Sequence, residues 1–323
     1  MSPAPRGECV MEKKKPSPGG RRQGFGARII RQRRLLLMIL PAFVFTFLFA
    51  YLPIWGMATA FFDYNPGLGF QGSEFVGLRH FSRFFSDGNF GNILRNTLAI
   101  SFLNITFGTV FPIGFAVLLN EMGNLRMKKL VQTVSYLPHF VSFVVVANIA
   151  LTFLSPSGQV NGLLSALGII KEPVMFFTLP KAFWWLVAAI NIWKKMGWSA
   201  IIYICAISGI DPQLYEAAMV DGAGRIKRIF AITLPGIAPT IVVLLIMAVP
   251  DLLNAGFDAS YLLGNAMVSD YSEVLDTYVY RLGIQQGQYS YATAIGLMRQ
   301  AVSLVLILSA NAFSRKVSEY SIF

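Results

Sequence analysis

The chain has 323 residues, of which 55% are hydrophobic and only 13% charged, and it carries a net charge of +11. Soluble domains are about one-quarter charged, so this composition excludes an ordinary soluble globular protein. Several apolar stretches reach the ~20 residues that a helix needs to cross a bilayer. The composition therefore predicts an all-α integral membrane protein.

The chain begins with a basic segment, residues 1–34, which holds ten Lys and Arg residues and is rich in Gly and Pro. We expect this segment to be a disordered cytoplasmic tail. It is too long and too charged for the start of a signal peptide, and no small-residue cleavage site follows it, so the first apolar segment should be retained. A basic tail can also bind nucleic acid, but membrane topology accounts for this charge, and we expect no nucleic-acid partner.

Six apolar segments follow, and each is expected to be a transmembrane helix within residues 35–323. They lie at about 35–60, 95–119, 130–154, 183–208, 237–258 and 292–313. Lys and Arg gather in the tail, in the loops 120–129 and 211–235 and at the C-terminus, whereas the alternate loops have fewer for their length. The positive-inside rule then places both termini in the cytoplasm.

The three loops on the other side, 61–94, 155–182 and 259–291, are rich in glycine and aromatic residues. They are either a landing surface for an extracytoplasmic partner or simple connectors. Residues 158–168 predict a short amphipathic helix on the outer membrane face. Gly67–Gly72 matches GxGxxG but has no βαβ pattern around it, so we interpret it as a turn.

No segment of the sequence matches a nucleotide-binding loop, a zinc motif or a catalytic grouping. Cys9 lies in the charged tail and Cys205 in an apolar segment, which predicts neither a disulfide nor a metal site. We therefore expect a protein that is not an enzyme and that binds no cofactor or metal of its own.

The polar loop 211–235 stands between two predicted spans. Asp211 is a good helix cap and Pro212 suits the first helical position, so a helix should run from here to about Asp221. The glycines in 222–224 end that helix, and a second, basic helix follows. Pro235 should then bend the chain into the fifth span. The result would be a compact knob, in contrast to a plain hairpin.

The loop residues Glu216-Ala217-Ala218, Asp221-Gly222-Ala223 and Leu234-Pro235 resemble the EAA loop of binding-protein-dependent (type I) ABC importer permeases. The segments 136–140, 153–158 and 197–203 resemble the carbohydrate-uptake branch of these permeases, which includes the polysaccharide (LplB-like) permeases and is related to the maltose permease large subunit. The resemblance covers residues 35–323. Over its whole length the chain is similar to permeases of alginate-type importers of acidic polysaccharide.

The resemblance implies a type I permease fold in the inner membrane of a bacterium. It implies a second, homologous permease as a heterodimer partner, two ATPase subunits that bind ATP and Mg²⁺, and an extracytoplasmic substrate-binding protein. In such a complex the loop residues that contact the ATPase would be Glu216, Ala217, Ala218, Asp221, Gly222, Leu234 and Pro235.

Polar residues inside the predicted spans are costly and usually face a cavity or a partner helix. Asn191, Lys194, Lys195 and Trp198 share one helical face. We predict a substrate pathway formed by some of the residues Asn148, Asn191, Trp193, Lys194, Lys195, Trp198, Asp251, Asn254 and Arg299. Lys and Arg would suit a uronate carboxylate, whereas Trp and Asn would suit sugar rings and hydroxyls. Alternatively, the lysines pair with Asp251 or with a partner-subunit carboxylate for assembly.

Three other functions stay open. An ABC permease for another solute, such as phosphate or an amino acid, would carry the same loop. An ion-driven secondary transporter predicts inverted repeats of interrupted spans, and the sequence shows no such symmetry. A membrane anchor without transport leaves the loop 211–235 and the intramembrane lysines unexplained.

Overall fold

The computed structural model describes residues 33–317, and their regular structure is helical except for one short hairpin. The chain divides into two compact units, residues 1–56 and 57–323. Most of the predicted tail, including Cys9, lies outside the described residues, so its expected disorder stays a prediction.

The described part of the first unit is one helical stretch. It consists of α2 (Arg33–Thr46), the π-helix η1 (Phe47–Tyr51) and the start of the 3₁₀ helix η2, which spans Leu52–Phe61 and continues into the second unit. No side chain of α2 or η1 is buried within the chain. A helix that is apolar on every side and exposed belongs in an apolar environment, which agrees with the first predicted span.

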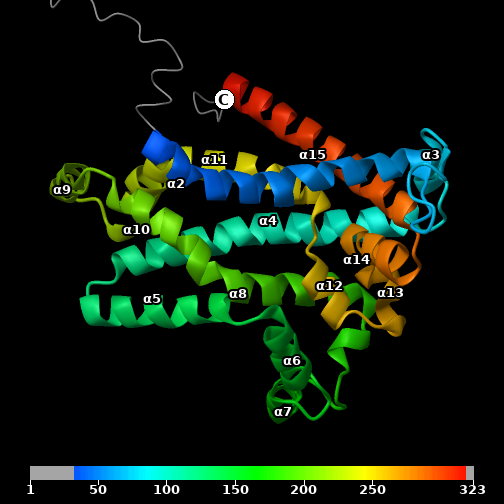
Figure 1. The fold of residues 1–323 in the computed structure, drawn as a ribbon. Helices are drawn as coiled ribbons and strands as arrows, with labels where there is room; N and C mark the ends of the chain where they lie inside the picture. Colours follow the sequence, from blue (N-terminus) through cyan, green and yellow to red (C-terminus); the bar gives the residue numbers. More distant parts are fainter. Residues whose placement is uncertain (1–32, 318–323) are drawn as a thin grey trace, which may run out of the picture. The chain divides into compact units, whose positions relative to one another are not determined.

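The second unit begins with the hairpin and is helical thereafter (Figure 1). Its first half contains β1 (Phe62–Asp63), β2 (Glu74–Phe75), α3 (Arg79–Phe85), α4 (Phe90–Glu121), α5 (Leu125–Phe140), α6 (Phe143–Phe153), α7 (Gln159–Ala166), η3 (Phe176–Thr178) and α8 (Pro180–Ser208). Its second half contains α9 (Pro212–Val220), α10 (Arg225–Arg228), η4 (Ile229–Thr233), α11 (Leu234–Ala248), η5 (Val249–Leu253), α12 (Phe257–Leu263), η6 (Ala266–Val268), α13 (Ser269–Ser272), α14 (Leu275–Tyr280), η7 (Arg281–Gln285) and α15 (Tyr289–Val317).

The long helices α4 and α8 lie along each other and form the centre of the second unit (Figure 1). α5 packs on α8, and at their crossing the Gly197 backbone approaches Ser135 so closely that a Cβ at 197 would lie 2.1 Å from the Ser135 carbonyl oxygen. α9 lies at one end of these helices, and α3, α13 and α14 lie at the other. We call these the α9 end and the α14 end.

Three apolar clusters fill the second unit. The first joins α4, α8 and α12 around Ile100, Phe183 and Val187. The second lies at the α14 end around Phe84, Tyr278 and Tyr291, and the third lies near the α9 end around Ala200, Tyr203 and Ile237. The first and third clusters therefore pack against α8 near its two ends.

Four helical stretches among the described residues are long and apolar enough to cross a membrane: 33–61, 90–121, 225–253 and 289–315. They coincide with four of the predicted spans. α8 fills the fourth predicted span with 29 residues, but its paired lysines and its tryptophans make it less apolar.

The third predicted span is not one straight helix. α5 and α6 meet at an angle of 103°. Pro138 lacks the N–H that would continue the helical ladder, and Ser142 is extended and accepts a hydrogen bond from Val145 N as the cap of α6. The prediction of a continuous span over 130–154 is therefore wrong, although the pair is apolar enough to cross as a broken span.

Pro235 also behaves differently from its prediction. The helical stretch continues from Arg225 to Leu253 without a bend that separates α10 from the span. A π-helix at Ile229–Thr233 directly precedes the proline. The wider turn changes the hydrogen-bond ladder where the proline ring and its missing N–H would disrupt an α-helix.

Two smaller sequence predictions are confirmed. Gly67–Gly72 lies in the turns between β1 and β2, with Gly69 at φ +63°. The short helix expected within 158–168 is α7.

Candidate functional site

A cavity of about 610 Å³ lies between α4, α8, the link between α5 and α6, and the chain from η5 to the start of α12. The polar lining residues are Ser101, Asn104 and Thr109 of α4; Ser142 of the α5–α6 link; Asn191, Lys194, Lys195 and Ser199 of α8; and Asp251, Asn254 and Asp258 of the chain from η5 to α12. Asn191 is buried, and its side-chain amide donates to Asn104 Oδ1 at 3.4 Å across the α4–α8 contact. We call this space the central cavity.

The two adjacent lysines of α8 have different surroundings. Lys194 Nζ donates to the carbonyl oxygens of Pro138 at 3.3 Å and His139 at 2.8 Å, at the end of α5. Pro138 O also accepts from Val141 N at 3.3 Å, so the ammonium chiefly satisfies the His139 carbonyl and complements the negative end of the helix dipole. Lys195 is exposed and lines the central cavity.

The alternative pairing of the lysines with Asp251 is not formed. None of the ion pairs in the described part of the chain includes Asp251, and Lys194 is occupied by the α5 carbonyls. Asp251 and Asn254 nevertheless line the same cavity as Lys195. Asn254 follows the end of η5 and does not lie within the helix, as the predicted span to 258 had implied.

Four predicted pathway residues lie outside the central cavity. Asn148 is exposed on α6, and half of Trp193 is exposed. The Trp198 ring stacks on the His139 ring, with centroids 4.5 Å apart. Arg299 forms an ion pair with Asp276. Helical periodicity placed Trp198 on the lysine face, but the bend after α5 brings His139 against its ring.

The polar stripe of α4 was missed in the sequence. Ser101, Asn104 and Thr109 fall with Gly108 and Pro112 on one helical face and line the cavity. Their spacing was the available signal. Ser199 and Asp258 were also missed. Helical spacing could not place Asp258, because the chain is not helical between Leu253 and Phe257.

The segment 211–235 forms the knob at the α9 end. Asp211 caps α9 by accepting from Gln213 N at 2.9 Å, as predicted. Gly222 has φ +74° and closes the helix: Gly222 N donates to Met219 O at 3.0 Å and Ala223 N to Ala218 O at 2.8 Å. This closure needs a residue in the left-handed region, which glycine adopts without a steric cost.

The knob is tied to the helix that follows it. The hydroxyl of Tyr215 on α9 lies 3.0 Å from the hydroxyl of buried Thr233 in η4. Leu234 packs against the apolar cluster that includes Ile207 and Ile237. Movement of α9 would therefore be passed to the span as well as to α8.

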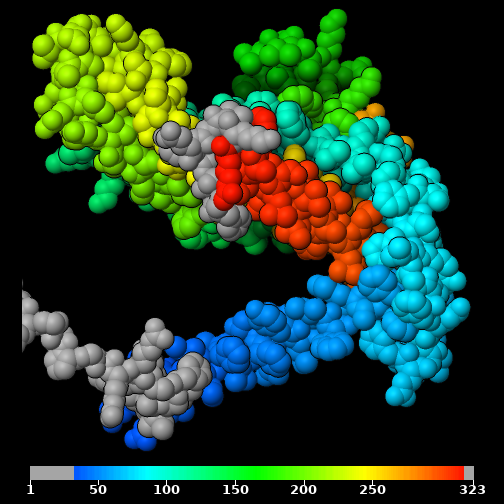
Figure 2. Space-filling view, turned by 90° about the horizontal axis from the view of Figure 1, so that it is seen from above, coloured from blue at the N-terminus to red at the C-terminus, as the bar shows by residue number. Residues whose placement is uncertain are grey.

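Several residues of the knob face outward. Glu216 and Ala217 are exposed, Ala218 is half-buried, and Asp221 and Pro235 are exposed. Large apolar side chains accompany them: Leu214, Met219, Val220, Ile226 and Phe230 are all at least half exposed. Figure 2 shows the yellow-green atoms of this segment gathered at one end of the second unit. An exposed apolar patch with a central carboxylate is typical of a protein-binding surface.

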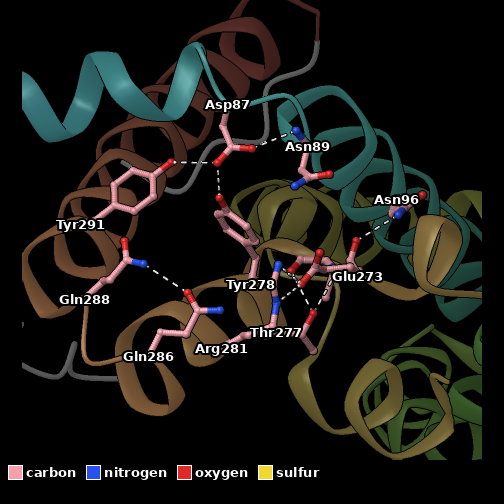
Figure 3. Close-up of polar contacts among 11 residues, drawn as sticks. Asp87, Asn89, Asn96, Glu273, Thr277, Tyr278, Arg281, Gln286, Gln288 and Tyr291 are labelled. Atoms are coloured by element: carbon pink, nitrogen blue, oxygen red, sulfur yellow. Dashed lines mark hydrogen bonds and ion pairs between the residues drawn. The ribbon is translucent and has the colours of Figure 1, made fainter. Parts of the chain in front are cut away.

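The α14 end holds a polar network (Figure 3). Asp87, in the link between α3 and α4, accepts hydrogen bonds from the hydroxyls of Tyr278 and Tyr291 and from Asn89 N. Burial raises the pKa of Asp87, but these hydrogen bonds and the charge of Arg83 outweigh it and hold the pKa below its usual value. Burial, followed by the bond to Asp87, raises the pKa of Tyr278.

The same network fastens α4 to the chain between α12 and α15. Asn96 is buried and donates to the carbonyl oxygens of Asp270 and Glu273, both at 2.9 Å. Glu273 also accepts from Arg281 at 2.7 Å and raises the pKa of that guanidinium. These contacts join the α3–α4 link, α4, α14, η7 and α15, and we call this group of segments the platform.

Tyr278→Phe should lower the thermal stability of this platform by about 1 kcal/mol, because it removes one hydroxyl hydrogen bond to an ionised carboxylate. The pKa of Asp87 is lower in the folded chain than its ordinary value of 3.8. The ionised Asp87 therefore stabilises the fold above pH 3.8, and this stabilisation is lost as the pH falls through the lower, folded pKa. Thermal midpoints of the purified protein at several pH values measure this. A difference from wild type that stays constant between pH 5 and 8 is expected; a difference that disappears at pH 6 would contradict the assignment.

Comparison with known proteins places these features in context. The family model described as "Binding-protein-dependent transport system inner membrane component" matches residues 108–319. The chain is 43% identical to the polygalacturonan/rhamnogalacturonan transport system permease protein YteP of Bacillus subtilis (strain 168), over 99% of this chain and 98% of YteP. It is 39% identical to protein LplB of the same organism, over 97% and 99% of the two chains.

Solved structures agree with these relatives. A chain of a bacterial alginate ABC transporter, in complex with an alginate pentasaccharide-bound periplasmic protein, superposes with a TM-score of 0.83 and 39% identity, covering 92% of this chain and 99% of that one. A second structure, of a bacterial ABC transporter involved in the import of the acidic polysaccharide alginate, gives a TM-score of 0.81 at 41% identity, covering 90% and 98%. The resemblance indicated by the loop residues is confirmed.

Proposed function

The chain belongs to the binding-protein-dependent transport system inner membrane component family, and we propose that it is the permease subunit of an ATP-driven importer for acidic oligo- or polysaccharides. The main support for the substrate class is the central cavity, where Lys195, which forms no ion pair within residues 33–317, lies with amides and hydroxyls beside the carboxylates of Asp251 and Asp258. Cations recognise uronate carboxylates, and amides and hydroxyls recognise sugar hydroxyls. The names of the relatives, which include polygalacturonan and alginate transporters, support the same class.

The proposed topology has six spans in a bacterial inner membrane, with both termini in the cytoplasm. In this topology the four long apolar stretches and the broken pair α5–α6 would be five crossings, and α8 would be the sixth. The basic loops at 120–129 and 211–235 would then lie on the cytoplasmic side. This arrangement puts the α9 end inside and the α14 end outside.

The proposed partners follow from these two ends. At the α9 end, the knob would dock in one of two ATPase subunits, which bind ATP and Mg²⁺. Glu216 would offer a charge to a basic group there, Ala217 and Ala218 would permit close approach, and Gly222 would hold the turn. At the α14 end, the platform would face an extracytoplasmic binding protein. A second, homologous permease would complete the pathway beside the central cavity.

In this mechanism closure of the ATPases displaces α9, and the displacement changes which side of the membrane the central cavity faces. The chain supplies two direct connections for this movement. One is the short link from α8 to α9, and the other is the contact of Tyr215 with Thr233. The sugar is held by side chains of α4, α8 and the η5–α12 segment while the access changes.

The two lysines should respond differently to neutralisation. Lys195→Gln is expected to lower the uptake of an acidic trisaccharide about tenfold more than that of a neutral one, because it removes a charge that faces the cavity without disturbing another contact. Lys194→Gln should lower both uptakes equally and reduce stability, because it removes the ammonium that the His139 carbonyl at the end of α5 accepts from.

Uptake of trigalacturonate and maltotriose into proteoliposomes measures this difference. Lys195→Arg, which keeps the charge, is the matched control and should retain the preference for the acidic sugar. Equal losses for both sugars in Lys195→Gln would instead assign that lysine to assembly.

The proposed function is tested by producing this chain with its partner subunits and binding protein and measuring ATP hydrolysis in proteoliposomes. Trigalacturonate or an alginate trisaccharide should stimulate hydrolysis, and maltotriose should not. Stimulation by phosphate or an amino acid alone would replace the sugar with another solute. The absence of any stable ATPase partner would overturn the importer assignment.

A further inference from the structure

A second cavity, of about 560 Å³, lies at the α14 end and has no role in the mechanism above. Its walls come from α12, α14, η7 and α15, and its polar lining includes Asp276, Tyr280, Thr293, Arg299 and Gln300. Both its size and its mixture of aromatic and polar groups suit a small sugar. Phe257 lines this cavity and also lines the central cavity, so one side chain borders both spaces.

Phe257 belongs to a group of three aromatic rings. Its ring stacks on that of Tyr261, with centroids 4.8 Å apart, and meets the Tyr280 ring edge-on at 5.0 Å. Tyr261 and Tyr280 are 5.3 Å apart. Aromatic rings offer rigid apolar faces with a polar hydroxyl beside them, and such faces suit the C–H surfaces of a pyranose ring.

The backbone before Phe257 is irregular. η5 ends at Leu253 and α12 begins at Phe257, and the chain between them is not helical, although Asn254 N caps η5 by donating to Asp251 O at 2.9 Å. Gly256 has φ +90°, a conformation that other residues rarely adopt. Non-helical backbone at membrane depth is tolerated where it lines a cavity, and residues 254–256 line the central cavity.

An ion pair fixes this segment from the side of the second cavity. Asp276 on α14 pairs with Arg299 on α15, and both side chains are mostly buried. The backbone amide of Gly256 lies near the Asp276 carboxylate, whose Oδ2 is buried without a hydrogen-bond partner among the described residues. The pair therefore joins α14 and α15 beside the residue that precedes Phe257.

We propose that Phe257 determines sugar specificity in this permease: its ring separates the two cavities and stacks on the sugar ring that passes from the second cavity to the central one. Asp276 and Arg299 act as positioning residues, because their ion pair fixes α14, whose Tyr280 ring contacts the Phe257 ring. This inference rests on the proposed function, since it assumes a sugar substrate.

The first test compares ring-removing and ring-keeping variants in the reconstituted full complex, with trigalacturonate as the probe. Phe257→Ala should raise the KM for uptake about fivefold, the effect of losing one stacking contact. Phe257→Tyr should keep the KM within about twofold of wild type, because its ring presents the same face. Phe102→Ala is the matched control: that ring is 62% exposed on α4 and lines neither cavity, so its KM should not change.

A double-mutant cycle tests the positioning role. Asp276→Asn should raise the KM in the wild-type background but have no further effect in Phe257→Ala, because the residue acts through the ring. A merely structural role would give the same additional loss in both backgrounds. Complex yield and thermal midpoint, measured for each variant, separate KM changes from loss of fold.

The outcomes separate this inference from the function on which it rests. Normal uptake by wild type together with an unchanged KM in Phe257→Ala would overturn the role of Phe257 and leave the importer intact. A similar KM increase in Phe102→Ala would also overturn it. If the wild-type complex transports neither trigalacturonate nor an alginate trisaccharide, the proposed substrate class and this inference fall together.

Discussion

Replacing Gly222 by Val is expected to reduce coupled uptake at least about tenfold while the chain still inserts in the membrane. Gly222 has φ +74°, and a β-branched residue in the left-handed region costs roughly 1–2 kcal/mol or more. The turn would relax, and the hydrogen bond from Ala223 N to Ala218 O would be lost with it. α9 would then take a different direction from the one that presents Glu216.

The control for this prediction is Gly222→Asn, because Asn tolerates left-handed backbone far better than Val. It should keep most of the uptake. Glu216→Lys provides an independent variant that reverses an exposed charge without straining the backbone, and it should uncouple transport in the same way. Uptake and sugar-stimulated ATP hydrolysis are measured together in proteoliposomes. Full uptake by the Val variant would show that the turn geometry is not needed for coupling.

Gly197→Val should destabilise the second unit by about 1–3 kcal/mol or more, the range typical of overpacking. The new Cβ would lie 2.1 Å from the Ser135 carbonyl oxygen and 2.5 Å from its carbonyl carbon. These are backbone atoms, so α5 as a whole would have to move away from α8. That movement would also pull the His139 carbonyl from Lys194 Nζ, one turn away.

Gly114→Ala is the matched control for Gly197. It is also a helical glycine, but a Cβ there meets no atom within 4 Å. Its replacement should be neutral or stabilise the helix by up to about 1 kcal/mol. Thermal unfolding of the solubilised complex measures both. Because the clash involves the Cβ itself, even Gly197→Ala should lower the midpoint, and a wild-type midpoint would contradict the close approach of the two helices.

The positions of most long helices could be predicted from the sequence because their signals are local. Apolar runs mark α4, α11 and α15, and Asp211 marks the start of α9 through its cap. The failures come from residues whose effect depends on neighbours in the helix. Pro138 lies near a sharp bend, whereas a π-helix absorbs Pro235, and both were simply prolines next to apolar runs.

For the cavity residues, too, the sequence predicted which residues share a helical face but not which residues they contact. Helical spacing put Asn191 and the two lysines on one face, and the structure brings them to one cavity. The contacts that give each residue its role are distant in sequence: the carbonyl partners of Lys194 lie 55 and 56 residues away, and the carboxylate partner of Arg299 lies 23 residues away. Spacing along one helix contains no information about them.

α8 runs without interruption from Pro180 to Ser208, and only residues 209–211 separate it from α9. In the proposed mechanism it would therefore work as a lever. Lys195 lies about 20 Å along the helix from its α9 end, so a tilt of about 10° pivoting at that end would carry the lysine about 3.5 Å. Thermodynamic linkage requires that the coupling act in both directions: if α9 affects binding in the cavity, binding in the cavity affects α9. In the proposed importer, a sugar bound to Lys195 would favour certain orientations of α9, and an ATPase docked on α9 would then bind more or less tightly according to what occupies the cavity.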